Sequence, residues 1–185
     1  MAQQSEIRDE VHRKIGRNLL LIQVIEAVLK RLIALNGLKV KTGGSNLDER
    51  LAAINKTTMG NLVGEYHDIF FAEQGGLHED DEDVQEVQLS VRFRFASDEL
   101  LAQSRKSFSS IVDERNKLVH HFLQELNVGA KGWEDADQKL EKQYKELTNQ
   151  FKHLRSVHDA LRKTVKKALS EERIFEDSQS EELNS

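Results

Sequence analysis

The chain has 185 residues, of which 38% are hydrophobic and 32% are charged, and its formal net charge is −5. The charged fraction exceeds the roughly 25% typical of globular proteins, which indicates amphipathic helices with wide solvent-facing surfaces. The sequence contains no cysteine, so disulfides and thiolate metal sites are excluded. The negative charge argues against broad, sequence-independent binding to nucleic-acid phosphates.

The sequence contains no pattern typical of a membrane span or of a secretory leader. Its most apolar stretch, residues 19–35, is interrupted by Gln23, Glu26, Lys30 and Arg31, which the interior of a bilayer would not accept. The beginning of the chain is polar and charged, unlike a signal peptide. We therefore expect a cytoplasmic protein with no membrane partner and with neither a metal nor another cofactor.

The first part of the chain is expected to form three helices. Apolar residues recur three or four apart over residues 5–35, which predicts one long helix that ends at Asn36 and Gly37. A second helix is expected over residues 47–55. A third is expected to begin after a threonine cap near residue 58 and to run through residue 70.

In the middle of the chain, the spacing of apolar residues changes from the period of a helix to that of a strand. Residues 87–95 alternate between apolar and polar side chains, the pattern of a strand with high β propensity, and residues 38–41 alternate in the same way. We expect these two segments to pair as a small two-stranded ribbon. The acidic residues 74–85 between them predict an exposed loop.

Two further long helices are expected in the second half. The first is capped by Ser97 or Asp98 and runs to about residue 126. The second spans about residues 133–169, with apolar and aromatic residues in alternating steps of four and three, a heptad-type seam. The sequence thus predicts an all-α bundle of long antiparallel helices. It forms one domain over residues 1–172, followed by an acidic, disordered tail over residues 173–185.

The most informative residue for function is an arginine on an apolar helix face. On a wheel of about 100° per residue, Arg115 lies near the centre of the apolar stripe, while Asn116 and His120 share one flank. A buried charge without a partner is very costly. Arg115 therefore either forms an ion pair inside the bundle, with Glu26 or Glu65 as candidate partners, or faces a cleft.

A cleft would suit metal-free cleavage of RNA, in which a base removes the 2′-hydroxyl proton and a cation stabilises the phosphate. His120 suits the proton transfer because imidazole titrates near neutral pH. Arg115 offers a permanently charged fork that matches phosphate oxygens, and Asn116 would orient the imidazole or hold the ribose. His121 is predicted to point the opposite way, towards solvent. We expect a two-fold homodimer that doubles the site, because one arginine, one asparagine and one histidine are few residues for an active site.

The segment RNKLVH at Arg115–His120 resembles the motif of the HEPN superfamily: arginine, a polar residue, three variable residues and histidine. The resemblance implies a commonly dimeric helical bundle and a metal-independent ribonuclease, such as a toxin or defence component regulated by an antitoxin or another protein. It implies that Arg115, Asn116 and His120 are catalytic. One toxin group carries a tyrosine that its antitoxin modifies where this chain has Phe122, so that regulation is not expected here. The alternative is a non-catalytic dimerisation or interaction module with Arg115 in a structural salt bridge.

Overall fold

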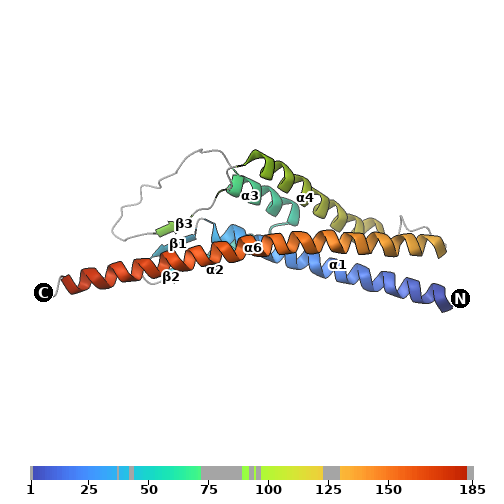
Figure 1. Ribbon diagram of the computed structural model, residues 1–185, viewed down its shortest axis with the longest axis horizontal. Coiled ribbons are helices and arrows are strands. Elements are labelled where there is room, and N and C mark those ends of the chain that lie inside the picture. Colours follow the sequence, from blue (N-terminus) through green and yellow to red (C-terminus); the bar gives the residue numbers. More distant parts are fainter. Residues whose placement is uncertain are drawn as a thin grey trace.

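The computed structural model describes residues 2–36, 38–41, 44–71, 89–91, 94, 97–122 and 130–182. Two long helices lie side by side along the molecule (Figure 1): α1 (Ala2–Leu35) and α6 (Ala130–Glu182). The shorter helices are α2 (Leu47–Ile54), α3 (Met59–Phe71) and α4 (Asp98–Asn116), which continues into the π-helical turn η1 (Lys117–His121). The predicted all-α helical bundle is confirmed. Within the described residues, no helix combines the length and apolarity needed to cross a bilayer.

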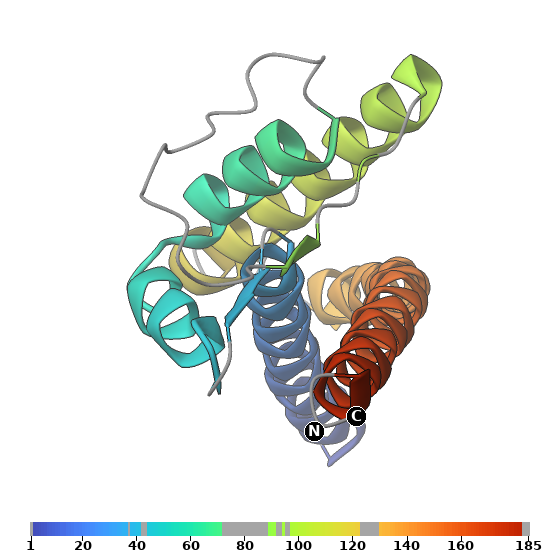
Figure 2. The same cartoon turned by 90° about the vertical axis from the view of Figure 1, so that its left-hand side faces the viewer.

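Viewed end on (Figure 2), α1 lies between α6 and a layer formed by α2, α3 and α4. The core on the α3–α4 side is aromatic: the ring of Tyr66 lies 4.7 Å from that of Phe70 and 5.4 Å from that of Phe108, measured between centroids. All three side chains are buried. Such ring pairs contribute about 0.5–1.5 kcal/mol each beyond the area that they bury. This cluster holds α4 in place above α1.

The end of α1 is closed by a side chain from α2. The guanidinium of Arg50 donates hydrogen bonds to the carbonyl oxygens of Ile33, Ala34 and Asn36, at 3.3, 3.0 and 2.8 Å. The last carbonyls of a helix have no partner within it, so this contact satisfies groups that would otherwise need water. It also fixes α2 against the last turn of α1, and these two helices together form one side of the cleft described below.

The helices α1 and α6 run in the same direction, whereas the sequence predicted antiparallel neighbours. Their contacts advance together along both helices. The ring of His12 lies 5.7 Å from that of Trp133, and further along each helix Arg17 Nη2 lies 3.1 Å from Glu141 Oε2. The shared direction is visible in Figure 1, where both helices begin at the same end of the molecule. The antiparallel prediction is therefore wrong for this pair.

The antiparallel prediction does hold for α4 against α6. Ser107 Oγ donates to Gln150 Oε1 at 2.9 Å, and Gln143 Nε2 donates to Glu114 Oε2 at 2.8 Å, so one helix ascends as the other descends. The chain returns along α4 before it enters α6, and α6 therefore retraces the direction of α1. Helix periodicity specifies which face is buried, but it does not specify the direction of the helix that covers it.

The heptad seam of α6 is buried as predicted, mainly against α1. Its buried members are Trp133, Leu140, Leu147, Leu154, Leu161 and Val165, and its half-buried members are Asp137, Tyr144, Phe151 and His158. The helix begins at Ala130, three residues before the predicted start at about residue 133. It extends to Glu182, and residues 173–182 are therefore helical, although their composition predicted a disordered tail. A domain boundary at residue 172 stays a prediction.

A small sheet lies beside the bundle. Strand β1 (Leu38–Lys41) pairs antiparallel with β3 (Leu89–Val91), with Leu38 opposite Val91, which confirms the predicted pairing. A third strand, β2 (Gly44–Ser45), joins the other edge of β1 and was not predicted. The predicted acidic loop over residues 74–85 lies outside the described residues.

Candidate functional site

The helix that carries the candidate site begins as its sequence predicts. Ser97 caps α4, because its Oγ accepts a hydrogen bond from the backbone N–H of Leu100 at 3.3 Å. The acidic residues Asp98 and Glu99 lie in the first turn, where the helix dipole favours negative charge. Further along, Phe108 and Ile111 are buried against the core, and this packing determines the face on which Arg115 emerges.

A π-helical turn changes the register between Arg115 and His120. Hydrogen bonds in a π-helix join residues five apart, so residues five apart lie close to one turn apart. The uniform wheel used on the sequence therefore fails within η1, and His120 lies closer in register to Arg115 than an α-helix would place it. Single π-helical turns within α-helices occur frequently at functional sites.

The two histidines of η1 are neighbours. His120 and His121 are both exposed, and their ring centroids lie 6.2 Å apart. The predicted exposure of His121 is confirmed. Its ring nevertheless lies beside that of His120, so the prediction that it is remote from the candidate site is not supported.

Arg115 lines a cleft of about 600 Å³ between α1, α2 and the junction of α4 with η1. Apolar side chains form much of its wall: Leu19 and Ile22 of α1, Leu51 of α2 and Val119 of η1. Its charged lining residues are Glu26, Lys30, Arg31 and Arg115. Of the two environments that the sequence allowed for Arg115, the structure has the cleft.

No ion pair of Arg115 with a carboxylate is found among the residues that the structure describes. Its Nη1 donates to Asn116 Oδ1 at 3.1 Å. Glu26, a predicted partner, instead pairs with Lys30 at 2.9 Å, and no pair joins Arg115 to Glu65 within the described part of the chain. Arg115 is therefore a half-buried cation whose one described polar contact is an uncharged amide.

The structure does not bring all three predicted residues into one pocket. Asn116 contacts Arg115 directly. His120 is exposed and is not among the side chains that line the cleft. Within the described residues, no hydrogen bond joins Asn116 to His120, so the predicted role of Asn116 in orienting the imidazole has no support in a single chain.

Sequence reasoning missed the contribution of α1 to this cleft. Lys30 donates to the backbone carbonyl of Asn55 at 3.1 Å and pairs with Glu26, so its charge is already partnered. Arg31 is exposed and, like Arg115, has no carboxylate ion pair among the residues described. The signal was present in the sequence, because Lys30 and Arg31 interrupt the most apolar stretch of the chain.

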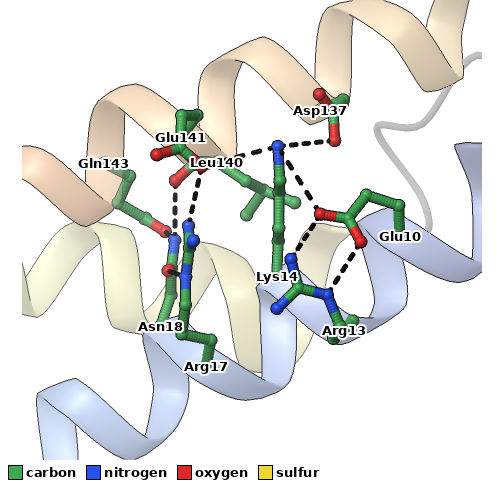
Figure 3. Close-up of polar contacts among 9 residues, drawn as sticks. All are labelled: Glu10, Arg13, Lys14, Arg17, Asn18, Asp137, Leu140, Glu141 and Gln143. Atoms are coloured by element: carbon green, nitrogen blue, oxygen red, sulfur yellow. Dashed lines mark hydrogen bonds and ion pairs between the residues drawn. The ribbon is translucent and has the colours of Figure 1, made fainter.

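The end of α4 is anchored to the rest of the bundle through a layer of polar contacts between α1 and α6 (Figure 3). The buried Asn18 donates from Nδ2 to the carbonyl of Leu140 at 2.9 Å and to Gln143 Oε1 at 2.7 Å. Gln143 in turn donates to Glu114, the residue before Arg115. Three helices are thus joined by one chain of hydrogen bonds that ends next to the candidate site.

A buried histidine lies in the aromatic core and was not singled out from the sequence. His67 Nε2 lies 3.1 Å from Ser104 Oγ, with the rings of Tyr66, Phe71 and Phe108 around it. Burial lowers the pKa of His67 below 6.5, because the charged imidazole is poorly solvated there, with nearby Arg105 acting in the same direction. Its surroundings are those of a core residue, and it lines none of the cleft around Arg115.

Comparison of the chain with known protein families, with curated proteins and with solved structures found no match. The resemblance to the HEPN superfamily thus rests on the segment Arg115–His120, and membership stays a prediction. Among the described residues, no group of three or more histidine, aspartate or glutamate side chains is arranged to hold a metal ion.

Proposed function

We propose that the protein is a metal-independent endoribonuclease of HEPN type, a cytoplasmic toxin or defence component held in check by an antitoxin or another regulatory protein. One observation carries the proposal: Arg115 lines an open cleft without a carboxylate partner in the described part of the chain. A guanidinium left in this state is available to phosphate oxygens, which it binds through paired hydrogen bonds.

In the proposed reaction, neutral His120 accepts the proton of a ribose 2′-hydroxyl. The 2′-oxygen attacks the adjacent phosphorus, and the bond to the 5′-oxygen breaks. The products are a 2′,3′-cyclic phosphate and a 5′-hydroxyl, whose proton returns from the imidazolium of His120. Arg115 stabilises the negative charge that builds on the phosphate, and Asn116 holds its guanidinium through the 3.1 Å hydrogen bond.

The proposal includes a homodimer, because one chain leaves His120 outside the cleft. A second copy related by a two-fold axis would bring its own His120 to the cleft that holds Arg115. Exposed apolar side chains support such a contact: Leu20 and Val24, about one turn apart on α1, are 63% and 45% exposed, and Val119, which lines the cleft, is 48% exposed. Contiguous exposed apolar side chains, such as those one turn apart on a helix, are typical of protein interfaces.

The test is cleavage of single-stranded RNA by the purified protein in the presence of a chelator. His120→Ala and Arg115→Ala are each expected to lower the rate by about 100-fold or more, since a positioned acid–base group and a positioned charge-stabilising group each contribute that much. His153→Ala, which changes an exposed histidine on α6, is the matched control and should leave the rate unchanged. Full activity in both site variants would refute the proposal. Strong destabilisation by Arg115→Ala with no effect of His120→Ala would favour the interaction module.

Mixing the two inactive variants tests the shared site. If Arg115 of one chain acts with His120 of the other, a heterodimer of Arg115→Ala and His120→Ala contains one intact site and regains part of the activity. If each chain acts alone, the mixture stays inactive.

A further inference from the structure

We propose that Arg31 of α1 is a second phosphate-binding residue, which holds a backbone phosphate of single-stranded RNA in the same cleft as Arg115. The ligand class rests on the proposed function, whereas the assignment of Arg31 rests on the geometry of the cleft. Arg31 lies outside the RNKLVH segment and comes from the first helix of the chain.

The side chains that line the cleft carry more positive than negative charge. Glu26 and Lys30 neutralise each other at 2.9 Å, and Lys30 is held further by the carbonyl of Asn55. The two guanidinium groups of Arg31 and Arg115 remain, and neither has a carboxylate ion pair among the described residues. The cleft is therefore positive, although the whole chain carries a formal net charge of −5. Like charges that share a cleft repel each other, and an anion bound between them removes that cost.

The size and the walls of the cleft suit a nucleotide. Its volume of about 600 Å³ lies within the roughly 300–1,000 Å³ typical of small-molecule sites. Leu19, Ile22, Leu51 and Val119 line it with apolar surface against which a base or ribose can pack. Two arginines in this cleft would bind the phosphate, a contact that carries no sequence information, so their contribution to binding should depend weakly on RNA sequence.

The experiment measures binding and not cleavage. A fluorescently labelled, fully 2′-O-methylated RNA oligonucleotide keeps its phosphates but lacks the 2′-hydroxyl nucleophile, so it binds without being cut. Arg31→Gln should raise the Kd about tenfold or more, the loss expected for a charge-assisted contact. The slope of log K against log salt concentration should fall by about 0.7, the value for one phosphate contact with a single strand. Arg31→Lys keeps the charge but loses the paired hydrogen-bond donors of the guanidinium, so its Kd should lie between those of the wild type and Arg31→Gln.

Arg162→Gln is the matched control, because it removes an equal charge from an exposed position on α6. Its Kd and salt slope should equal those of the wild type, and thermal melting confirms that each variant is folded. The proposal is overturned if the wild type does not bind the RNA, if Arg31→Gln binds like the wild type, or if Arg162→Gln weakens binding as much as Arg31→Gln. If Arg31→Gln weakens binding but the wild type does not cleave unmodified RNA, the phosphate site stands and the proposed function fails. If the wild type cleaves RNA and Arg31→Gln binds normally, the proposed function stands and the phosphate site at Arg31 fails.

Discussion

Two groups of cations in this molecule have opposite environments. Between α1 and α6, Lys14 is almost enclosed, with 10% of its side chain exposed, and its Nζ lies 2.8 Å from Asp137, 3.4 Å from Glu141 and 4.0 Å from Glu10. In the cleft on the other side of α1, Arg31 and Arg115 have no ion pair with a carboxylate in the described part of the chain. The charges of the polar layer between α1 and α6 are paired. In the cleft, Arg31 and Arg115 have no carboxylate partner among the described residues.

The difference teaches which cations hold the fold and which can bind a ligand. A buried charge destabilises a protein unless it is paired, so Lys14 can be enclosed only at the register where Asp137 lies opposite it. Arg17 adds to this alignment, since its guanidinium pairs with Glu141 and lies 3.7 Å above the ring centroid of Tyr144. Arg31 and Arg115 are solvated by the open cleft, and their charges remain available.

The largest expected effect comes from breaking the polar layer. Lys14→Ala leaves the half-buried carboxylate of Asp137 without its cation, and we expect the free energy of unfolding to fall by about 1–3 kcal/mol. Urea denaturation followed by circular dichroism measures this change. Lys139→Ala, an exposed lysine on the same stretch of α6, should change stability by less than about 0.5 kcal/mol. Equal effects of the two substitutions would show that the layer does not stabilise the fold.

The second expected effect is a dependence of stability on pH. Hydrogen bonds from Arg13 and Arg17 lower the pKa of Glu10 and Glu141, respectively, below 4.5, and a hydrogen bond to Asp137 raises the pKa of Lys14 above 10.5. A lowered carboxyl pKa stabilises the fold above the unfolded value and is lost as pH falls. A raised lysine pKa stabilises the fold below its unfolded value and is lost as pH rises. Stability should therefore fall on acidification below about pH 4.5 and on alkalinisation above about pH 10.5.

The substitution Glu141→Gln separates the contribution of the polar layer to acid stability from that of His67. The lowered pKa of His67 also favours the folded state at higher pH. The variant should lose part of the acid dependence and keep most of the alkaline one, because the raised pKa of Lys14 depends first on its hydrogen bond to Asp137 and only secondly on Glu141. Thermal melts of both proteins across the pH range measure the difference, and parallel acid limbs would contradict the role given to Glu141.

The smallest expected effect is the change in the free energy of unfolding when a cation of the cleft is removed. Arg115→Gln removes a cation that has no described carboxylate partner, and glutamine retains a polar end, so the free energy of unfolding should change by less than about 0.5 kcal/mol. The same urea titration tests it. A loss comparable to that of Lys14→Ala would mean that Arg115 is a structural cation, and the contrast between the two regions would fail.

The sequence by itself determined the helices, the faces that they bury and one pairing of strands. Periodicity sufficed for α1 and for the seam from Trp133 to Val165, because burial follows from apolar spacing along one helix. Alternation sufficed for the pairing of β1 with β3. The sequence also placed Arg115 on an otherwise apolar face, which is the observation behind the proposed function.

Only the tertiary structure decided the direction of α6 along α1, the π-helical turn before His120 and the meeting of Arg31 with Arg115 in one cleft. Each depends on contacts between residues far apart in the chain, whereas a wheel treats one helix of constant pitch. Lys14 and Arg115 are both cations on largely apolar faces. One is enclosed and the other is open because α6 brings carboxylates to the first, while the second faces the cleft between α1 and α2.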